Sequence, residues 1–301
     1  MSFTYKKGWQ LKNGTHNFCF AISSGKIESF RGGHAKEVLQ TEDICEYIDF
    51  CKNNHAKKIA LIDLPQKDFD FVIDELCDFV EEIELFYSLG SDGANHDKLS
   101  KCKNLKKVLI DCCRGTVNLW QVSDNKLLQS LEITGVERLK NQQGLKNAGL
   151  SQLVIKNRNS NLNDTKKPVI KDFSLFSTMP NLNSLELFVG KKSNKKDDLI
   201  ALSGLKSIQK ITLPKNYFTF GQFAWLSGKL PETKGIGCIK DQRWNKRIEK
   251  YEYTINGTRM AWEFKDYCGT GINKYLKKFD ELVEKYKNDD NPPVDVYKKQ
   301  R

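Results

Sequence analysis

Two adjacent cysteines, Cys112 and Cys113, are the first residues of this sequence that suggest chemistry. Two thiolates can bind a zinc ion or form a redox pair. Metal sites favour C-x-x-C spacing, however, and adjacent residues of a strand point to opposite faces, so one ion could not easily take both sulfur atoms. We therefore expect a structural role, with Cys113 pointing inward and Cys112 more exposed.

The spacing of three further cysteines also indicates a structural role. Cys51, Cys77 and Cys102 are separated by 26 and 25 residues, which is the interval of a repeat in this sequence. They fall just before successive apolar strands, where a small apolar side chain can fill a core. The chain has nine cysteines, an odd number, and no apolar secretion signal at its start. We therefore expect reduced thiols and a cytoplasmic protein.

No other motif predicts catalysis, a metal or a cofactor. The histidines are His16, His34, His55 and His96. They lack H-x-x-x-H and H-E-x-x-H spacing, so we expect each of them on the surface or in a turn. The acidic stretch 68–84 lacks the spacing of a calcium loop and is typical of a solvated helix face. The glycines of 269–274 lack the spacing of a phosphate loop. The sequence thus predicts a protein that is not an enzyme.

The net charge of +11 is unevenly distributed along the 301 residues. Residues 63–97 include eleven acidic residues and one lysine, whereas residues 156–215 include twelve basic and five acidic residues. Residues 240–301 are also basic, with fifteen basic and eleven acidic residues. Such asymmetry concerns partners and steering rather than the fold. No apolar run approaches the roughly 18 residues of a membrane helix, so we expect no membrane association.

The elements that position these residues follow a sequence repeat. The pattern L-x-x-L-x-L occurs at Leu105, Val108 and Ile110, and equivalent copies surround it. The copies begin at Ala56, Val80, Leu105, Leu128, Leu150, Leu182 and Ile208, with a degenerate copy at Thr233. The intervals between them are 24, 25, 23, 22, 32, 26 and 25 residues. Each copy predicts a short strand with one buried face, and the interval of 32 indicates an exposed loop at 156–169.

This pattern resembles the leucine-rich-repeat family, in a divergent bacterial form, whose unit reads L-x-x-L-x-L-x-x-N/C. The resemblance covers residues 41–239, in about seven or eight repeats. Cys113 and Asn216 fit the ninth position, whereas Leu64, Val136 and Gly190 depart from it. The resemblance implies an α/β solenoid with parallel strands on the concave face and helices on the convex face. This scaffold serves many functions, so little follows about the task.

Helices are expected between the strands, and caps at both ends of the repeats. The expected helices span 41–53, 67–79, 97–103, 139–148, 170–178, 197–205 and 217–227, with capping residues such as Thr41, Asp68 and Asp197. Residues 1–40 predict an N-terminal β-hairpin or small antiparallel sheet that turns at Asn13-Gly14.

Residues 240–301 differ in composition from the repeats. They predict a hairpin that turns at Asn256-Gly257 and an amphipathic helix over 272–287. We favour an α+β cap for this region. A separate binding module is the alternative, because aromatic residues interleaved with Lys and Arg suit single-stranded nucleic acid.

The strand residues between the leucines are predicted to line the concave face and to bind a partner. They are Lys58, Glu82, Glu84, Phe86, Lys107, Leu109, Asp111, Glu132, Val154, Lys156, Glu186, Phe188 and Lys210. Phe86, Leu109, Val154 and Phe188 are expected to be exposed apolar anchors in a polar surround, which is typical of protein-binding surfaces. A basic patch is expected in the loop after the next strand, either solvated or in contact with phosphate or an acidic protein. It comprises Lys191, Lys192, Lys195 and Lys196.

Two functions follow as hypotheses. The first is a non-enzymatic, monomeric scaffold without a cofactor, which binds a partner protein on its concave face as an adaptor or an immunity-type protein. The alternative is association with nucleic acid through the basic segments 156–215 and 240–301. Salt separates the two, because nucleic-acid binding weakens steeply as salt is added.

Overall fold

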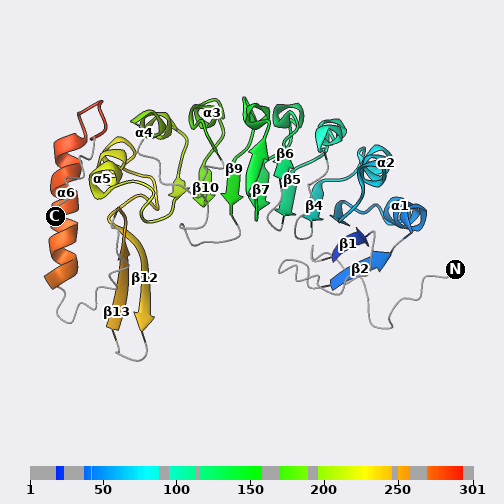
Figure 1. The fold of residues 1–301 in the computed structure, drawn as a ribbon, viewed down its shortest axis with the longest axis horizontal. Helices are drawn as coiled ribbons and strands as arrows, with labels where there is room; N and C mark the ends of the chain where they lie inside the picture. Colours follow the sequence, from blue (N-terminus) through cyan, green and yellow to red (C-terminus); the bar gives the residue numbers. More distant parts are fainter. Residues whose placement is uncertain are drawn as a thin grey trace.

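The computed structural model describes residues 18–23, 37–41, 43–87, 95–112, 116–157, 170–188, 196–245, 250–257 and 270–293. Its main element is a nine-stranded sheet in which neighbouring strands are parallel. In sheet order the strands are β11 (Lys210–Thr212), β10 (Ser184–Phe188), β9 (Gln152–Lys156), β7 (Ser130–Thr134), β5 (Lys107–Cys112), β4 (Glu82–Tyr87), β3 (Lys58–Ile62), β1 (Phe18–Ser23) and β2 (Glu37–Thr41). The strands lie on the inner side of an arch and the helices on its outer side (Figure 1).

The register of the sheet aligns equivalent positions of the sequence repeat. The fourth positions of successive units are partners in neighbouring strands, and all of their side chains are fully buried. They are Ile59, Ile83, Val108, Leu131, Leu153, Leu185 and Ile211. The sixth positions form a second buried row of Leu61, Leu85, Ile110, Ile133, Ile155 and Leu187. The α/β class and the parallel strands predicted from the apolar pattern are therefore confirmed.

A ladder of backbone hydrogen bonds fixes this register at the start of the strands. The Lys57 carbonyl accepts the N–H groups of both Glu81 (2.7 Å) and Glu82 (2.9 Å). The same doubled acceptance recurs at the carbonyls of Glu81, Lys106, Gln129, Ser151 and Asn183. A one-residue slip of any strand would break these bonds and turn its buried side chains to the opposite face.

The connections on the outer side contain both α-helices and 3-10 turns. The α-helices are α1 (Ile44–Asn53), α2 (Gln66–Leu76), α3 (Ser174–Ser177), α4 (Lys196–Ser203) and α5 (Phe220–Lys229), and the 3-10 helices are η1 (Asp97–Lys101), η2 (Val122–Asp124) and η3 (Gln142–Leu145). Strands β6 (Thr116–Asn118) and β8 (Arg138–Lys140) form a small parallel pair. The helix expected over 139–148 is therefore wrong, because a short strand and a 3-10 turn occupy that segment. No helix of the described ranges is both long and apolar enough to cross a membrane.

The capping residues differ from those expected. Helix α1 begins after Asp43, whose carboxylate accepts the N–H groups of Cys45 (2.9 Å) and Glu46 (3.1 Å), whereas Thr41 ends β2. Asp68 lies inside α2 rather than at its start. Helix α5 has a reciprocal capping box between Thr219 and Gln222. These caps satisfy N–H groups that the first helical turn leaves without partners.

The N-terminal strands also differ from expectation. Strand β1 lies between β2 and β3, and it is parallel to both. The antiparallel cap expected for residues 1–40 is therefore wrong for these strands, which extend the main sheet instead. The expected turn at Asn13-Gly14 lies outside the described residues.

A hairpin follows the last repeat, and it precedes the turn expected at Asn256-Gly257. Strands β12 (Ile239–Asn245) and β13 (Lys250–Ile255) are antiparallel and join through residues 246–249, and Asn256-Gly257 forms a turn directly after β13. The strand expected after this turn lies outside the described residues, so the hairpin expected at Asn256-Gly257 stays a prediction. Gly257 has a φ of +77°, and a Cβ atom on it would lie 2.1 Å from the backbone nitrogen of Phe220. The pair thus packs the base of the hairpin directly against the start of α5.

The C-terminal helix α6 (Thr270–Tyr286) matches the amphipathic helix expected over 272–287. It lies beside α5 at the end of the arch (Figure 1), with the Phe279 and Phe220 ring centroids 5.3 Å apart. The chain after α6 also binds α5, because the Trp225 indole donates to the Asp289 carbonyl at 2.7 Å. These contacts cover part of α5.

Candidate functional site

The residues expected to bind a partner come together on the inner face of the sheet. They alternate with the buried rows and therefore point away from the helices. The parallel register arranges them in three rows that cross the strands. The first row is Lys58, Glu82, Lys107, Ser130, Gln152, Ser184 and Lys210; the second is Ala60, Glu84, Leu109, Glu132, Val154, Glu186 and Thr212; the third is Ile62, Phe86, Asp111, Thr134, Lys156 and Phe188.

Two of the four expected apolar anchors are not exposed. Leu109 is 5% exposed and Val154 is 3% exposed, so their assignment as surface anchors is wrong. Both lie in the second row between longer side chains of the neighbouring strands, Glu132 among them. Strands only about 4.8 Å apart allow such long side chains to cover a shorter one. Phe86, near the end of β4, is half-buried.

Phe188 carries a contact that the sequence pattern did not indicate. The Lys240 amine of β12 lies 5.3 Å from the centroid of the Phe188 ring and also donates to the Leu213 carbonyl. Burial of Lys240 in this contact lowers the pKa of its amine below the ordinary value. The hairpin therefore reaches the inner face and covers part of Phe188.

Ion pairs neutralise some of the charges on the inner face. Lys58 binds the buried carboxylate of Glu84 at 2.6 Å and also approaches Glu82 at 3.8 Å. A buried carboxylate requires such a partner, because leaving it unpaired would cost several kcal/mol. Lys156 and Glu186 form a second pair at 3.2 Å between β9 and β10.

Other inner-face charges form no ion pair with the residues that the structure describes. Within the described ranges, Lys107, Asp111, Glu132 and Lys210 form no salt bridge. These side chains are exposed or half-buried, and they lie on β5, β7 and β11. They are the groups that the fold leaves able to pair with charges of another molecule.

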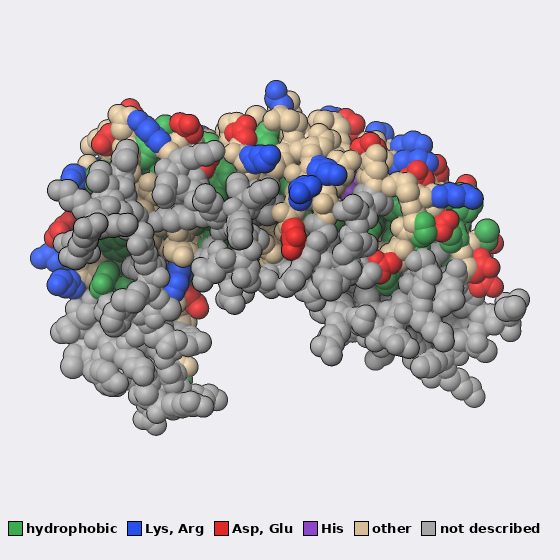
Figure 2. Space-filling model, in the orientation of Figure 1, with side chains coloured by type: hydrophobic (Ala, Val, Ile, Leu, Met, Phe, Trp, Pro, Cys, Tyr) green, Lys and Arg blue, Asp and Glu red, His purple; other side chains and the backbone are tan. Residues whose placement is uncertain are grey.

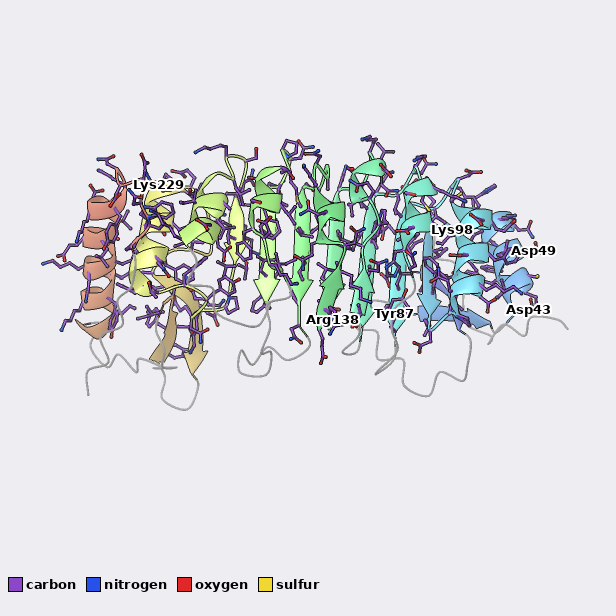
Figure 3. The ribbon with its side chains drawn as sticks, turned by 45° about the horizontal axis from the view of Figure 1, so that its top comes forward. Asp43, Asp49, Tyr87, Lys98, Arg138 and Lys229 are labelled. Atoms are coloured by element: carbon purple, nitrogen blue, oxygen red, sulfur yellow. The ribbon has the colours of Figure 1, made fainter. Side chains whose placement is uncertain are left out.

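His96 is a buried side chain, so the expectation of a surface or turn position is wrong for it. Its imidazole is fully buried between the Phe69 and Trp120 rings. Nδ1 donates to the Asn118 carbonyl at 2.9 Å, and Nε2 accepts from the Tyr87 hydroxyl at 2.8 Å. Burial lowers the pKa of His96 to about 4, although the Asn118 hydrogen bond opposes that shift. Tyr87 lies at the end of β4 (Figure 3). The hydrogen-bond partners of His96 belong to other segments of the chain, so no local motif in the sequence indicated its burial.

The described cysteines show different degrees of burial. Cys51 and Cys102 are fully buried, and burial raises the pKa of each thiol to about 12, so the predicted core role is confirmed for both. Cys77 is only half-buried, at the end of α2, and therefore lies at the margin of the core. The Cys112 side chain and Cys113 lie outside what the structure describes. The contrast expected between these two thiols stays a prediction.

The outer face carries both charges in close alternation. Figure 2 shows acidic and basic side chains interspersed over the outside of the arch. Lys98, on the helix-covered side (Figure 3), pairs with Asp74 of α2, and Lys101 binds the same carboxylate at 2.7 Å. These hydrogen bonds lower the pKa of Asp74. The solvated acidic helix face expected at 68–84 is present in α2, and such exposed pairs contribute little to stability.

The described residues offer no metal site and only one member of the basic patch. No group of three or more potential metal-binding side chains occurs in the part of the chain that the structure describes. Lys191, Lys192 and Lys195 lie outside that part, whereas Lys196 begins α4 and donates to the Asn291 side chain at 2.5 Å. Comparisons with protein-family models, with curated proteins and with solved structures find no match to this chain.

Proposed function

We propose that the chain is a leucine-rich-repeat solenoid of a divergent, bacterial type. The support is that each repeat unit of the sequence contributes one parallel strand to the sheet. The units follow one another at intervals of 22 to 26 residues, with one longer interval of 32. Equivalent apolar positions are partners in the sheet and lie buried, and equivalent carbonyls accept paired N–H groups. Stacked units of this kind bury a continuous core that one unit alone could not form. The inner face corresponds to the concave face of such a solenoid.

The function we propose is binding of a partner protein on the inner face, as an adaptor or an immunity-type protein that neutralises its partner. The observation that carries this proposal is the set of unpaired charges, Lys107, Asp111, Glu132 and Lys210, on a continuous sheet face beside the half-buried ring of Phe86. An aromatic group beside charges is the usual make-up of a protein interface. A scaffold role does not require convergent titratable groups, which catalysis would need.

Nucleic-acid binding through 156–215 and 240–301 is the second candidate and has less support. Two lysines of these segments are already engaged, because Lys156 pairs with Glu186 and Lys196 donates to Asn291. Each phosphate contact by a lysine makes affinity fall with salt, with a slope close to the number of contacts. A log–log salt slope steeper than about −4 for any nucleic acid would therefore favour this candidate.

The test of the proposed function uses matched substitutions on opposite faces of the sheet. A partner is captured from cell extract with the full chain, and its Kd is then measured for each variant. Phe86→Ala and Gln152→Arg change the inner face, whereas Phe71→Ala and Gln143→Arg make the same chemical changes at exposed outer positions of α2 and η3. Phe188 is avoided because of its contact with Lys240.

Phe86→Ala should weaken binding by about fivefold or more, since an aromatic anchor at an interface contributes more than about 1 kcal/mol. Gln152→Arg should weaken binding at least as much, because its larger charged side chain would obstruct a partner on this face. The outer-face variants should stay within about twofold of the parent, because single surface changes seldom exceed about 0.5 kcal/mol. Equal effects on both faces, or none on the inner face, would refute the proposal.

A further inference from the structure

Three carboxylates gather on the inner face where β4, β5 and β7 lie side by side. Glu84, Asp111 and Glu132 occupy the second and third rows of these strands, with Phe86 and Leu109 among them. We call these five residues the acidic patch. The remaining described positions of the same rows, from β3 to β7, are Ala60, Ile62 and Thr134. No lysine or arginine therefore occupies these rows of β3, β4, β5 and β7, although the chain as a whole has a net charge of +11.

The register sets the spacing within the acidic patch. Glu84 and Glu132 both face Leu109 from opposite sides, so they are two strand spacings, or roughly 10 Å, apart. Asp111 pairs with Thr134 and is therefore a diagonal neighbour of Glu132, at a backbone separation of about 7–8 Å. Glu84 is held by Lys58 at 2.6 Å, whereas Asp111 and Glu132 have no salt bridge with another described residue. The backbones that carry these two carboxylates thus lie about 8 Å apart, beside an aromatic side chain.

The positions of these carboxylates favour one class of ligand over others. The described acidic side chains do not approach closely enough to form a group that could hold one metal ion. A phosphate backbone would be repelled by the same carboxylates. Two positive side chains of a protein partner fit, because residues two apart in a strand or one turn apart in a helix have about the required separation.

We infer that the acidic patch binds a basic segment of the partner protein, through at least two Lys or Arg side chains that pair with Asp111 and Glu132. The stem of such a side chain would pack on the Phe86 ring, which is half-buried beside Asp111. The inference rests on the proposed function and specifies the chemistry of the partner. The net charge of +11 opposes long-range attraction of a cationic segment, so the attraction must come locally from the carboxylates of the acidic patch.

The test selects peptides without assuming their charge. A random peptide library displayed on phage is panned against the full chain, and the enriched peptides are synthesised and titrated against variants. The double variant Asp111→Asn/Glu132→Gln removes two negative charges from the acidic patch. Asp49→Asn/Asp124→Asn is the matched control, because it removes two exposed carboxylates from α1 and η2 (Asp49 is labelled in Figure 3).

Enriched peptides should carry paired Lys or Arg residues and should bind the Asp111→Asn/Glu132→Gln variant about tenfold more weakly than the parent. The matched control should change their affinity by less than about twofold, apart from a small effect of net charge. Equal weakening by the two double variants would overturn the inference, as would enrichment of neutral or acidic peptides, or no enrichment at all.

The peptides also separate the failure of this inference from the failure of the proposed function. Gln152→Arg places a large cation on the inner face, one strand beyond the acidic patch. If neutral or acidic peptides change their affinity for this variant, the inner face binds proteins but the acidic patch does not choose a basic partner. If the enriched peptides bind every inner-face variant as they bind the parent, both proposals are wrong.

Discussion

Acid should destabilise this protein through one buried histidine. His96 is neutral in the folded chain, because its Nδ1 donates to the Asn118 carbonyl and its Nε2 accepts from the Tyr87 hydroxyl. Burial lowers its pKa to about 4, whereas the ordinary value of 6.5 applies to the unfolded chain. The unfolded chain therefore binds a proton between these two pH values and the folded chain does not. The contribution of His96 to the free energy of unfolding is therefore fully present above pH 6.5. It is lost as the pH falls towards 4.

The magnitude follows from the difference between the folded and unfolded pKa of His96. A tenfold change in proton affinity corresponds to about 1.4 kcal/mol, so a fall in the pKa from 6.5 to about 4 represents about 3 kcal/mol in the free energy of unfolding. The local slope is about 1.4 kcal/mol per pH unit across this window. That loss is a large fraction of the total free energy of unfolding, which for a folded protein is typically on the order of 10 kcal/mol.

The variant His96→Gln isolates this contribution, because an amide does not titrate. Urea unfolding is followed by circular dichroism and by tryptophan fluorescence, to which Trp120 contributes beside the imidazole. The parent should be the more stable protein at pH 7, and the difference in unfolding free energy should shrink by about 3 kcal/mol by pH 4. Carboxylates that titrate in both proteins cancel from this difference.

His55→Gln supplies the control, because His55 lies in an exposed turn after α1. Its difference from the parent should stay nearly constant across the same pH range. A constant difference for His96→Gln as well would refute the assignment of acid sensitivity to the buried imidazole. A difference that grows as the pH falls would reverse the sign and exclude a neutral His96.

Three further outcomes are expected. Gly235→Ala should lower the unfolding free energy by more than about 2 kcal/mol in urea titrations, because Gly235 has a φ of +91° and its Cβ would lie 2.2 Å from a carbonyl oxygen. Gly237→Ala is the control and should be nearly neutral, since a Cβ at Gly237 would have nothing within 4 Å. Asn125→Ala should cost about 3 kcal/mol in the same assay, since two buried carbonyls and an indole N–H lose their partner. In native alkylation read by peptide mass spectrometry, exposed Cys45 should react and Cys102, with a pKa of about 12, should not.

The sheet could be predicted from the sequence because its signal is local and repeated. Each strand needs only an alternating apolar segment, and a near-constant interval places the segments side by side. The connections were less predictable, since the apolar positions of η1, η2 and η3 show which residues face the core but not whether a turn is α or 3-10. The close approach of Gly257 to Phe220 is a tertiary contact, which the local Asn-Gly turn signal could not indicate.

The burial of polar groups could not be predicted from the sequence for a different reason. His96 is satisfied by a hydroxyl nine residues before it and a carbonyl twenty-two residues after it, and neither spacing matches a local motif. Asn125 likewise binds the carbonyls of Leu99 and Cys102 in the preceding unit. A polar residue can be buried only if distant partners satisfy it, so its burial depends on the assembled sheet.

The inner face shows why alternation alone does not identify a binding anchor. Alternation assigns the side of the sheet correctly, because it depends only on the two-residue period of a strand. Exposure depends on the neighbours, and closely spaced strands leave Leu109 and Val154 covered by longer side chains. A residue of this face can therefore contact a partner only if its side chain is long enough to stay exposed among its neighbours, as that of Lys107 is. Since the buried rows are nearly uniform, the proposed choice of partner would depend on the order of charges along the face, which changes from one strand to the next.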